Sequence, residues 1–319
     1  MVKRTETREE LRSGRAPAKS ALGPRGRGLL GRLFGSERVP PAISRPKEAV
    51  SVAIASGKGG TGKSFLATNL AVLLNQQMLR VTLVDCDFGL ACNHLLLGVT
   101  PKQTLSHLLA GQAQLEDILL TTPSGPQLVP GGSGIMQMAD LTDRQLLAFA
   151  SVLGELASAN DVLLLDVGAG IAPQVMLTLL AADHVVVVTQ PEIAALTDAY
   201  AVIKCCARLR ADARFSVVVN RVLSPGHGEK TFEKLREVTR RHVQVELQYL
   251  GEIPEDSSVT QRRLNQKPVV LSDPDGATAR AIHGIVQRLQ QVEVPLARRQ
   301  VDPDATLESR FREHRLFLG

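Results

Sequence analysis

The sequence predicts a doubly wound α/β fold, with a mainly parallel sheet, helices on both faces and a single core domain. Several short segments, such as "VLLLD" and "HVVVVT", are apolar nearly throughout, which is typical of strands covered on both faces. Helical patterns such as "DRQLLAFASVLGELA" separate these segments along the chain. Regular alternation of strands and helices indicates a parallel sheet, because each helix returns the chain to the start of the next strand.

The first predicted strand, 50–56, leads directly into a glycine-rich loop. The run "AVSVAIAS" is apolar and β-branched, and "SFLATNLAVLLNQ" after the loop has helical spacing. Between them, one segment matches G-x-x-x-x-G-K-[ST], in which backbone N–H groups turn toward phosphate oxygens beside a helix N-terminus. We therefore expect nucleotide phosphates to be bound by Gly57, Lys58, Gly59, Gly60, Thr61, Gly62, Lys63 and Ser64.

Six further strands are predicted in order, at 81–85, 127–129, 162–166, 184–189, 215–220 and 247–253. Ligands of such sheets bind beyond the carboxyl ends of the strands. Each polar residue at these ends could serve only as a turn or a helix cap. Together they predict a polar rim, formed by Asp85, Asp166, Gln190, Asn220 and Pro254.

Acidic residues on this rim predict a Mg²⁺ site. Asp166 closes "DVLLLD" and is the Walker B candidate, which holds Mg²⁺ usually through water while Ser64 coordinates the ion directly. Asp85 and Asp87, in "LVDCDFGLA", project to the same side of an extended segment. One of them could serve the metal and the other the attacking water. The alternative for Asp87 is a structural role as a helix N-cap.

Composition is compatible with one soluble domain and its appendages. The 319 residues are 44% apolar and only 3% aromatic, with no Trp. The four cysteines lack the spacing of a zinc site or a disulfide framework, which favours a reducing cytosol. No apolar run is long enough for a membrane span or a secretion signal. We therefore expect a cytoplasmic protein that could lie peripherally on the inner face of the cell membrane.

The basic charge of the chain is concentrated at its start. Residues 1–48 hold 12 Lys and Arg against 5 Asp and Glu, or +7, so the remaining 271 residues sum to −2 against the whole-chain value of +5. This stretch is rich in Pro, Gly and Arg, which is typical of disorder. The sequence therefore predicts a basic, largely disordered arm at 1–47, a P-loop ATPase domain at 48–291 and a tail at 292–319.

Two short amphipathic segments flank the predicted domain. Segment 27–36, "RGLLGRLFGS", and segment 305–318, which contains "LESRFREHRLFL", place Leu and Phe on one helical side among arginines. Either could lie on a membrane surface. The alternatives are a helix packed on the core, a partner-binding arm or a solvated run of charge.

The loop "KGGTGKS", with Lys58 as a second lysine, resembles the deviant Walker A motif of the MinD/ParA ATPases. The segment "VDCDFGLACNHLLLGVTPKQTLSHLLAG" is most similar to the FlhG (FleN) branch, the flagellar number regulators. Further segments, including "LVPGGSG", "VVVNRV" and "LQYLGEIPED", extend the resemblance over about residues 50–272. It implies a slow Mg-dependent ATPase that dimerises with ATP and controls the number or placement of a polar structure, above all flagella.

The resemblance also implies roles for individual residues. Lys63 would act on the phosphates of its own subunit and Lys58 on those of the partner, where its charge would stabilise the transition state and tie hydrolysis to dimerisation. Asp87 would position the attacking water, so that Asp87, Lys58 and Lys63 form the catalytic set. The Mg²⁺ ligands would be Ser64, Asp85 and Asp166, and the adenine pocket would be lined by Asn220, Arg221 and Pro254.

Three positions depart from the family pattern, and they leave alternatives open. Val167 stands where relatives usually carry Ser or Thr, and Cys92 and His94 replace the usual Asn and Asp. Because the Val167 position lacks a hydroxyl, a non-hydrolysing, ATP-dependent scaffold is one alternative. The other is a ParA-type segregation ATPase whose basic arm holds DNA. The partners expected are a second copy of the chain, a membrane surface and an FlhF-type GTPase or flagellar protein, with DNA less favoured.

Overall fold

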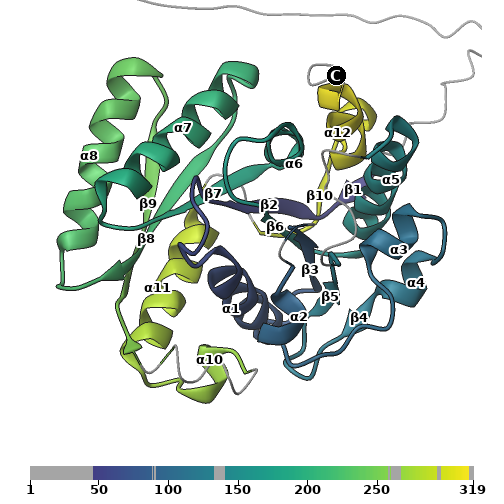
Figure 1. Ribbon diagram of the computed structural model, residues 1–319, viewed down its shortest axis with the longest axis horizontal. Helices are drawn as coiled ribbons and strands as arrows, with labels where there is room; N and C mark the ends of the chain where they lie inside the picture. The colour runs from purple at the N-terminus through teal and green to yellow at the C-terminus, as the bar shows by residue number, and fades with distance from the viewer. Residues whose placement is uncertain are drawn as a thin grey trace, which may run out of the picture. The chain divides into compact units, whose positions relative to one another are not determined.

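An eight-stranded sheet lies at the centre of the fold, with the strand order β4-β5-β3-β6-β2-β7-β8-β9 (Figure 1). The computed structural model describes residues 46–87, 89, 91–132, 141–257, 259, 267–292 and 296–315. Within this sheet, all neighbouring strands from β5 to β9 are parallel, and β4 is antiparallel to β5. The predicted α/β fold with a mainly parallel sheet is therefore confirmed.

The seven strands predicted from the sequence are all present. Their ends lie within two residues of the predicted ones: Val50–Ala55 (β2), Val81–Cys86 (β3), Gln127–Val129 (β5), Val162–Val167 (β6), His184–Thr189 (β7), Phe215–Val222 (β8) and Leu247–Pro254 (β9). Strands β2, β3, β6 and β7 are buried along their whole length, as expected for strands covered on both faces. The short strand Leu120–Thr121 (β4) was not predicted and lies at the edge of the sheet.

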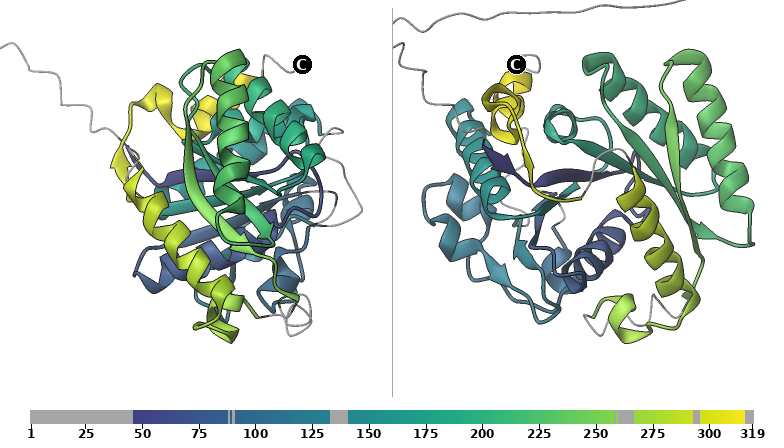
Figure 2. Two further views of the ribbon diagram at one scale, coloured as in Figure 1. Left: turned by 90° about the vertical axis from the view of Figure 1, so that its left-hand side faces the viewer. Right: turned by 180° about the vertical axis from the view of Figure 1, so that it is seen from behind.

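Helices cover both faces of the sheet (Figure 2). One hydrophobic core joins the sheet to Lys63–Gln76 (α1), Val269–Ser272 (α10) and Ala277–Gln291 (α11). The other joins it to Asp143–Ala159 (α5), Pro173–Ala181 (α6), Ile193–Leu209 (α7), His227–His242 (α8) and Leu307–Arg315 (α12). The last two residues of the glycine-rich loop, Lys63 and Ser64, form the start of α1. The loop therefore lies at the carboxyl edge, which we define as the end of the sheet where the parallel strands finish.

Three short helices between β3 and β5 were not predicted. They are Asn93–Leu96 (α2), Leu105–Leu109 (α3) and Leu115–Ile118 (α4). Helix α3 begins with a capping box, in which the side chains of Thr104 and His107 bond each other's backbone N–H groups. Elements of four or five residues are too short to show a clear helical period, which is why the sequence pattern did not reveal them.

The segment after α11 packs on the core. Lys47–Glu48 (β1) pairs antiparallel with Arg299–Gln300 (β10), and a 3₁₀ turn, Pro303–Ala305 (η3), leads into α12. Leu307 and Phe311 of α12 are buried, and Phe311 meets the ring of Phe149 edge to face with 5.3 Å between ring centroids. The apolar side predicted for segment 305–318 is therefore covered by α5 and α6 over the residues described.

The other predicted amphipathic segment, 27–36, lies outside the described residues, as does Leu318. None of the helices in the described ranges is long and apolar enough to cross a membrane.

Candidate functional site

The glycine-rich loop lies at the carboxyl end of β2, between β6 and β7. Gly60 and Gly62 adopt φ angles of 79° and 102°, in the left-handed region that favours glycine. A side chain at Gly62 would also overlap the amide of Asn220. The Nδ2 group of Asn220 donates to the carbonyl of Thr61 at 2.7 Å, and Gln190 Nε2 donates to the carbonyl of Gly60 at 3.3 Å. Two residues of the predicted rim therefore fix the conformation of the loop.

The two lysines of the loop lie in different environments. Lys63, the first residue of α1, is only 7% exposed. The Lys58 side chain is 50% exposed, and its Nζ lies 3.8 Å from Oε2 of Glu192, which is also on the surface. Lys63 is thus placed to act inside its own loop, whereas Lys58 can reach a molecule that approaches from outside.

Asp85 and Asp166 lie side by side at the carboxyl edge. They are register partners on the parallel strands β3 and β6, and both are buried. Burial, helped by the charge of Asp166, raises the pKa of Asp85 to about 8. Burial also raises the pKa of Asp166, although Lys63 opposes this effect. Two desolvated carboxylates repel each other, so a cation between them would be stabilised.

The donor atoms at this edge fit a magnesium ion. Oδ1 of Asp166 is buried and has no hydrogen-bond partner among the described residues, and the nearby Ser64 side chain acts to lower the pKa of this carboxylate. Magnesium prefers oxygen ligands and usually keeps several waters. The residues described include no group of three or more His, Cys, Asp or Glu that could hold a metal ion. A magnesium ion here would therefore take further ligands from phosphate oxygens and water.

Asp87 lies just beyond Asp85. Its backbone N donates to Oδ1 of Asp85 at 3.2 Å, and its own Oδ1 accepts from the backbone N of Gly89 at 3.2 Å. The N-cap residue of α2 is Cys92, so the alternative of an N-cap role for Asp87 is wrong for this helix. The half-buried carboxylate of Asp87 is left close to the metal-site pair.

Asn93 joins the two buried carboxylates and was missed in the sequence. Its Nδ2 donates to Oδ2 of Asp166 at 2.8 Å, and its backbone N donates to Oδ2 of Asp85 at 3.1 Å. Asn93 and Asp166 are 73 positions apart, so no local motif links them. The only indication in the sequence was that Asn93 lies between Cys92 and His94, two residues that depart from the family pattern.

The three residues predicted for the adenine pocket lie together. Asn220, Arg221 and Pro254 border one small, open hollow, which we call the β8–β9 hollow. Its other lining residues are Phe65, Ile253, Glu255, Asp256, Val259 and Thr278. Oδ1 of Asn220 accepts from the backbone N of Arg221 at 2.9 Å, and Arg221 Nε lies 3.7 Å from Oε2 of Glu255. The structure thus places a mixed apolar and polar hollow next to the loop.

Comparison with known protein families assigns this site to a nucleotide-binding domain. The model of the CobQ/CobB/MinD/ParA nucleotide binding domain matches residues 52–269. The chain belongs to this family. Antiactivator FleN of Pseudomonas aeruginosa is 37% identical over 244 residues, which cover 76% of this chain and 87% of FleN. The flagellum site-determining protein YlxH of Helicobacter pylori is 37% identical over 221 residues, covering 69% and 74% of the two chains.

A solved structure supports the same assignment within the family. The septum site-determining protein MinD of Pyrococcus horikoshii, in complex with Mg-ADP, superposes with a TM-score of 0.63 at 27% identity. The match covers 76% of this chain and 96% of that one. The predicted resemblance to the MinD/ParA ATPases, and to FleN among them, is confirmed.

The three departures from the family pattern lie at or near the metal site. Val167 is buried directly after Asp166, so it adds no polar group there. Burial raises the pKa of the Cys92 thiol, although the nearby Ser64 side chain opposes this effect. Burial lowers the pKa of His94, which no described hydrogen bond joins to either carboxylate.

Proposed function

We propose that this protein is a Mg²⁺-dependent ATPase switch, which dimerises when it binds ATP and thereby controls the number or placement of flagella. Two kinds of observation support the proposal. The relatives FleN and YlxH are named for antiactivation and for determining the flagellum site. The loop and the acidic residues of this chain supply the groups that phosphoryl transfer requires.

The proposed chemistry is mainly positioning and electrostatics. The backbone of residues 57–64 and the Lys63 ammonium hold the phosphates, and Asn220, Arg221 and Pro254 border the base. Ser64 and Asp166 would hold Mg²⁺, with Asp85 beside them. When bound, the ion neutralises charge on the phosphate oxygens. Asp87 orients the attacking water, because its carboxylate lies close enough to both members of this pair for its charge to raise their pKa values.

Dimerisation would complete the site. The Lys58 ammonium is half exposed, and among the described residues its one ion pair is a long contact with an exposed glutamate, Glu192. Such a contact is worth little, so Lys58 can exchange it for phosphate oxygens of a second copy. A positive charge delivered in this way stabilises the transition state. Hydrolysis is then slow in the monomer and faster in the dimer.

The observation that carries the proposal is the buried Asp166 oxygen without a partner, beside Ser64 at the end of the glycine-rich loop. A buried carboxylate oxygen is normally satisfied, and an ion with its bound water would satisfy this one. Single-turnover hydrolysis of ATP with and without Mg²⁺ therefore separates the switch from the scaffold alternative.

A cellular test addresses the flagellar role. The chain would be expressed in Pseudomonas aeruginosa lacking FleN, and flagella would be counted by electron microscopy. We expect the normal number to return with the native chain and not with the Lys63→Ala variant. Failure of the native chain, at matched expression and with ATP hydrolysis intact, would contradict the flagellar role and leave the ATPase proposal standing.

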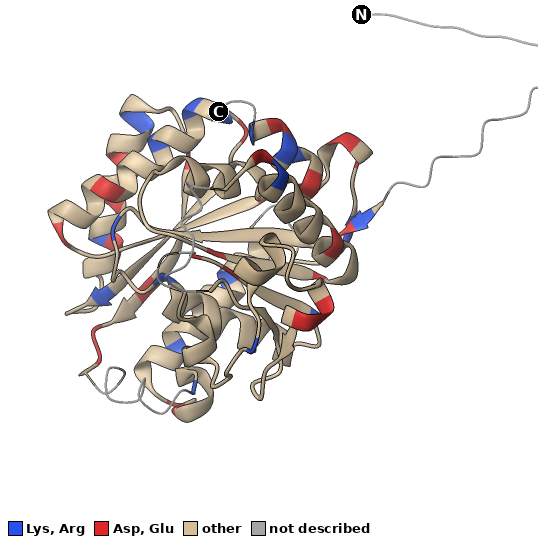
Figure 3. Cartoon of the chain, turned by 45° about the vertical axis from the view of Figure 1, so that its right-hand side comes forward, with Lys and Arg blue, Asp and Glu red and all other residues tan. Residues whose placement is uncertain are grey.

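For location, we propose the cytoplasm, with attachment to the inner face of the membrane through segment 27–36. The apolar residues Leu307 and Phe311 of the other amphipathic segment are already buried in the core. An FlhF-type GTPase or another flagellar protein is the partner class we propose besides a second copy. In the view of Figure 3, basic and acidic residues are interspersed along the helices. This mixture gives no support to DNA binding by the visible face of the domain.

A further inference from the structure

We propose that Asn93 is a positioning residue of the metal site, which holds Asp85 and Asp166 in place and leaves Oδ1 of Asp166 available near Ser64. The inference deepens the proposed function and rests on it. Asn93 is fully buried and donates to both carboxylates, through Nδ2 to Asp166 and through its backbone N to Asp85. It is therefore a bridge between the two strands that carry the acidic pair.

The two donated hydrogen bonds restrict the orientation of each carboxylate. Asn93 holds Oδ2 of Asp166 through its side-chain amide and Oδ2 of Asp85 through its backbone N. The last torsion of an aspartate side chain is otherwise broad, so these bonds limit how far each carboxylate can turn. Asn93 therefore helps to hold both side chains in one arrangement at the metal site.

The same hydrogen bonds fix which oxygens remain available. The Asn93 amide occupies Oδ2 of Asp166, and Oδ1 of the same carboxylate is buried without a partner among the described residues. Oδ1 of Asn93 is likewise buried without a hydrogen-bond partner among the described residues. Oδ1 of Asp166 and Oδ1 of Asn93 are thus both available to the water shell of a bound ion. Groups that orient metal ligands in this way typically change metal affinity by 10- to 100-fold when removed.

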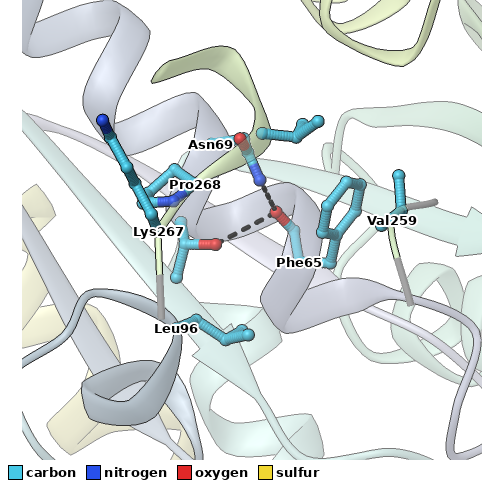
Figure 4. A pocket seen from close by; sticks show the side chains of 8 residues that line it. Phe65, Asn69, Leu96, Val259, Lys267 and Pro268 are labelled. Atoms are coloured by element: carbon cyan, nitrogen blue, oxygen red, sulfur yellow. Dashed lines mark hydrogen bonds between the residues drawn. The ribbon is translucent and has the colours of Figure 1, made fainter. Parts of the chain in front are cut away.

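The position of Asn93 is itself fixed from both sides. At the start of α2, the side chain of the preceding residue, Cys92, lies near that of Ser64. Farther along the helix, Leu96 lines a small pocket together with Phe65, whose carbonyl accepts hydrogen bonds from Thr68 and Asn69 (Figure 4). Phe65 follows Ser64 directly and also borders the β8–β9 hollow. Helix α2 is therefore held against the first turn of α1, which carries the predicted metal ligand.

Binding of a fluorescent ADP analogue to the full-length chain, measured across a Mg²⁺ titration, tests this role without relying on hydrolysis. For Asn93→Ala we expect the half-saturating Mg²⁺ concentration to rise by ~10-fold or more. Affinity for the analogue in EDTA should stay within about twofold of the native value, because the phosphate loop is untouched. Asn93→Leu, which keeps the branched shape without the donor, should behave like the Ala variant.

The control is His94→Ala, the next residue of α2, which should leave the Mg²⁺ dependence unchanged. Thermal unfolding and binding in EDTA show whether each variant is folded. If folded Asn93→Ala and Asn93→Leu respond to Mg²⁺ as the native chain does, the positioning role is wrong. If the native chain itself binds no nucleotide, or binds it without regard to Mg²⁺, the proposed function fails as well, and the two failures are therefore distinguishable.

Discussion

Two buried aspartates, at opposite ends of the same sheet, have very different surroundings. Asp183 lies at the amino edge, where the parallel strands begin, and accepts from the backbone N and the Oγ of Ser51 at 2.9 and 2.7 Å. It is also paired with Arg299 and, at 2.9 Å, with Arg310. Asp166 lies at the carboxyl edge and keeps an oxygen with no partner in the described structure. The carboxylate of Asp183 is satisfied by contacts within the fold, whereas that of Asp166 keeps an oxygen that can bind a ligand.

The contrast separates a structural charge from a functional one. At the amino edge, β10 and α12 supply the arginines that neutralise Asp183, and the backbone N of Leu307 donates to Glu48 at 3.0 Å. Burial still raises the pKa of Glu48. At the carboxyl edge, the fold places Asp85 and Asp166 together and leaves Oδ1 of Asp166 without a partner among the described residues. Substitutions at the amino edge should therefore cost stability, and those at the carboxyl edge should cost activity.

The largest effect is expected for Asp183→Ala. It leaves the arginines of β10 and α12 partly buried without their counter-charge, which should lower the free energy of unfolding by ~3–5 kcal/mol. Chemical denaturation measures the loss, and ATP hydrolysis per folded molecule should be retained. The matched control is Asp212→Ala, which removes an exposed carboxylate paired with Arg210 and should cost only ~0–1 kcal/mol. Equal losses for the two variants would contradict the contrast.

Lys58→Ala tests whether Lys58 acts on the phosphates bound at the carboxyl edge of a second copy. Truncating one member of a charge pair buried at an interface costs ~2–5 kcal/mol, so ATP-dependent dimerisation should weaken by tenfold or more. Analytical ultracentrifugation with ATP measures it, and nucleotide binding to the monomer should be kept. Lys63→Ala is the comparison variant, because it should weaken nucleotide binding itself. A Lys58→Ala protein that dimerises normally would rule out the trans role.

Asp87→Ala should retain ATP binding, dimerisation and stability but lose hydrolysis by ~10²-fold or more, the range typical of a residue that handles the attacking water's proton. Single-turnover kinetics measure the loss. Chemical denaturation checks that the variant is folded. Unchanged turnover would reject the assignment of Asp87 to the nucleophile.

The raised pKa of Asp85 predicts a pH dependence of stability in the absence of nucleotide and metal. Between the unfolded value, ~3.9, and about 8, the folded protein holds a proton that the unfolded chain has lost. Stability should therefore fall as pH rises through this window, by up to about 1.4 kcal/mol per pH unit for one proton. Asp85→Asn should remove that part of the slope, measured by denaturation at pH 5.5 and pH 7.5. Parallel slopes would show that Asp85 is ionised throughout.

The smallest effect concerns membrane attachment. A basic residue near an anionic surface contributes about 1 kcal/mol, and one short segment is marginal alone, so two copies in an ATP dimer should be needed. We expect sedimentation with anionic liposomes to require ATP, to weaken at high salt and to be lost when residues 1–45 are removed. A chain ending at Val301 should lose stability rather than lipid affinity, because it lacks α12. Sedimentation that is independent of residues 1–45 would contradict attachment through segment 27–36.

The sequence was sufficient for the parts of the fold that local pattern determines. Uniformly apolar strands and the Gly57–Ser64 motif predicted the sheet, the loop and the rim residues Asp85, Asp166 and Asn220. It was insufficient where contacts join distant residues. Asn93 meets Asp166 over 73 positions, and Leu307 meets Glu48 over 259. The burial of Phe311 could not be read from its amphipathic segment, because the same pattern suits a membrane surface and a protein core.

The pairing of β1 with β10 bears on how the protein is made. Glu48 is synthesised early, but Leu307, which donates to it, is added 259 residues later. At typical elongation rates of roughly 5–20 residues per second, that interval is about 10–50 s. During this time all strands of the large sheet and the whole nucleotide edge have been translated. Glu48 still lacks Leu307, and Asp183 still lacks its two arginines. The nascent chain is thus expected to acquire its binding site before its final stability, and chaperones would act on it with the amino edge still open.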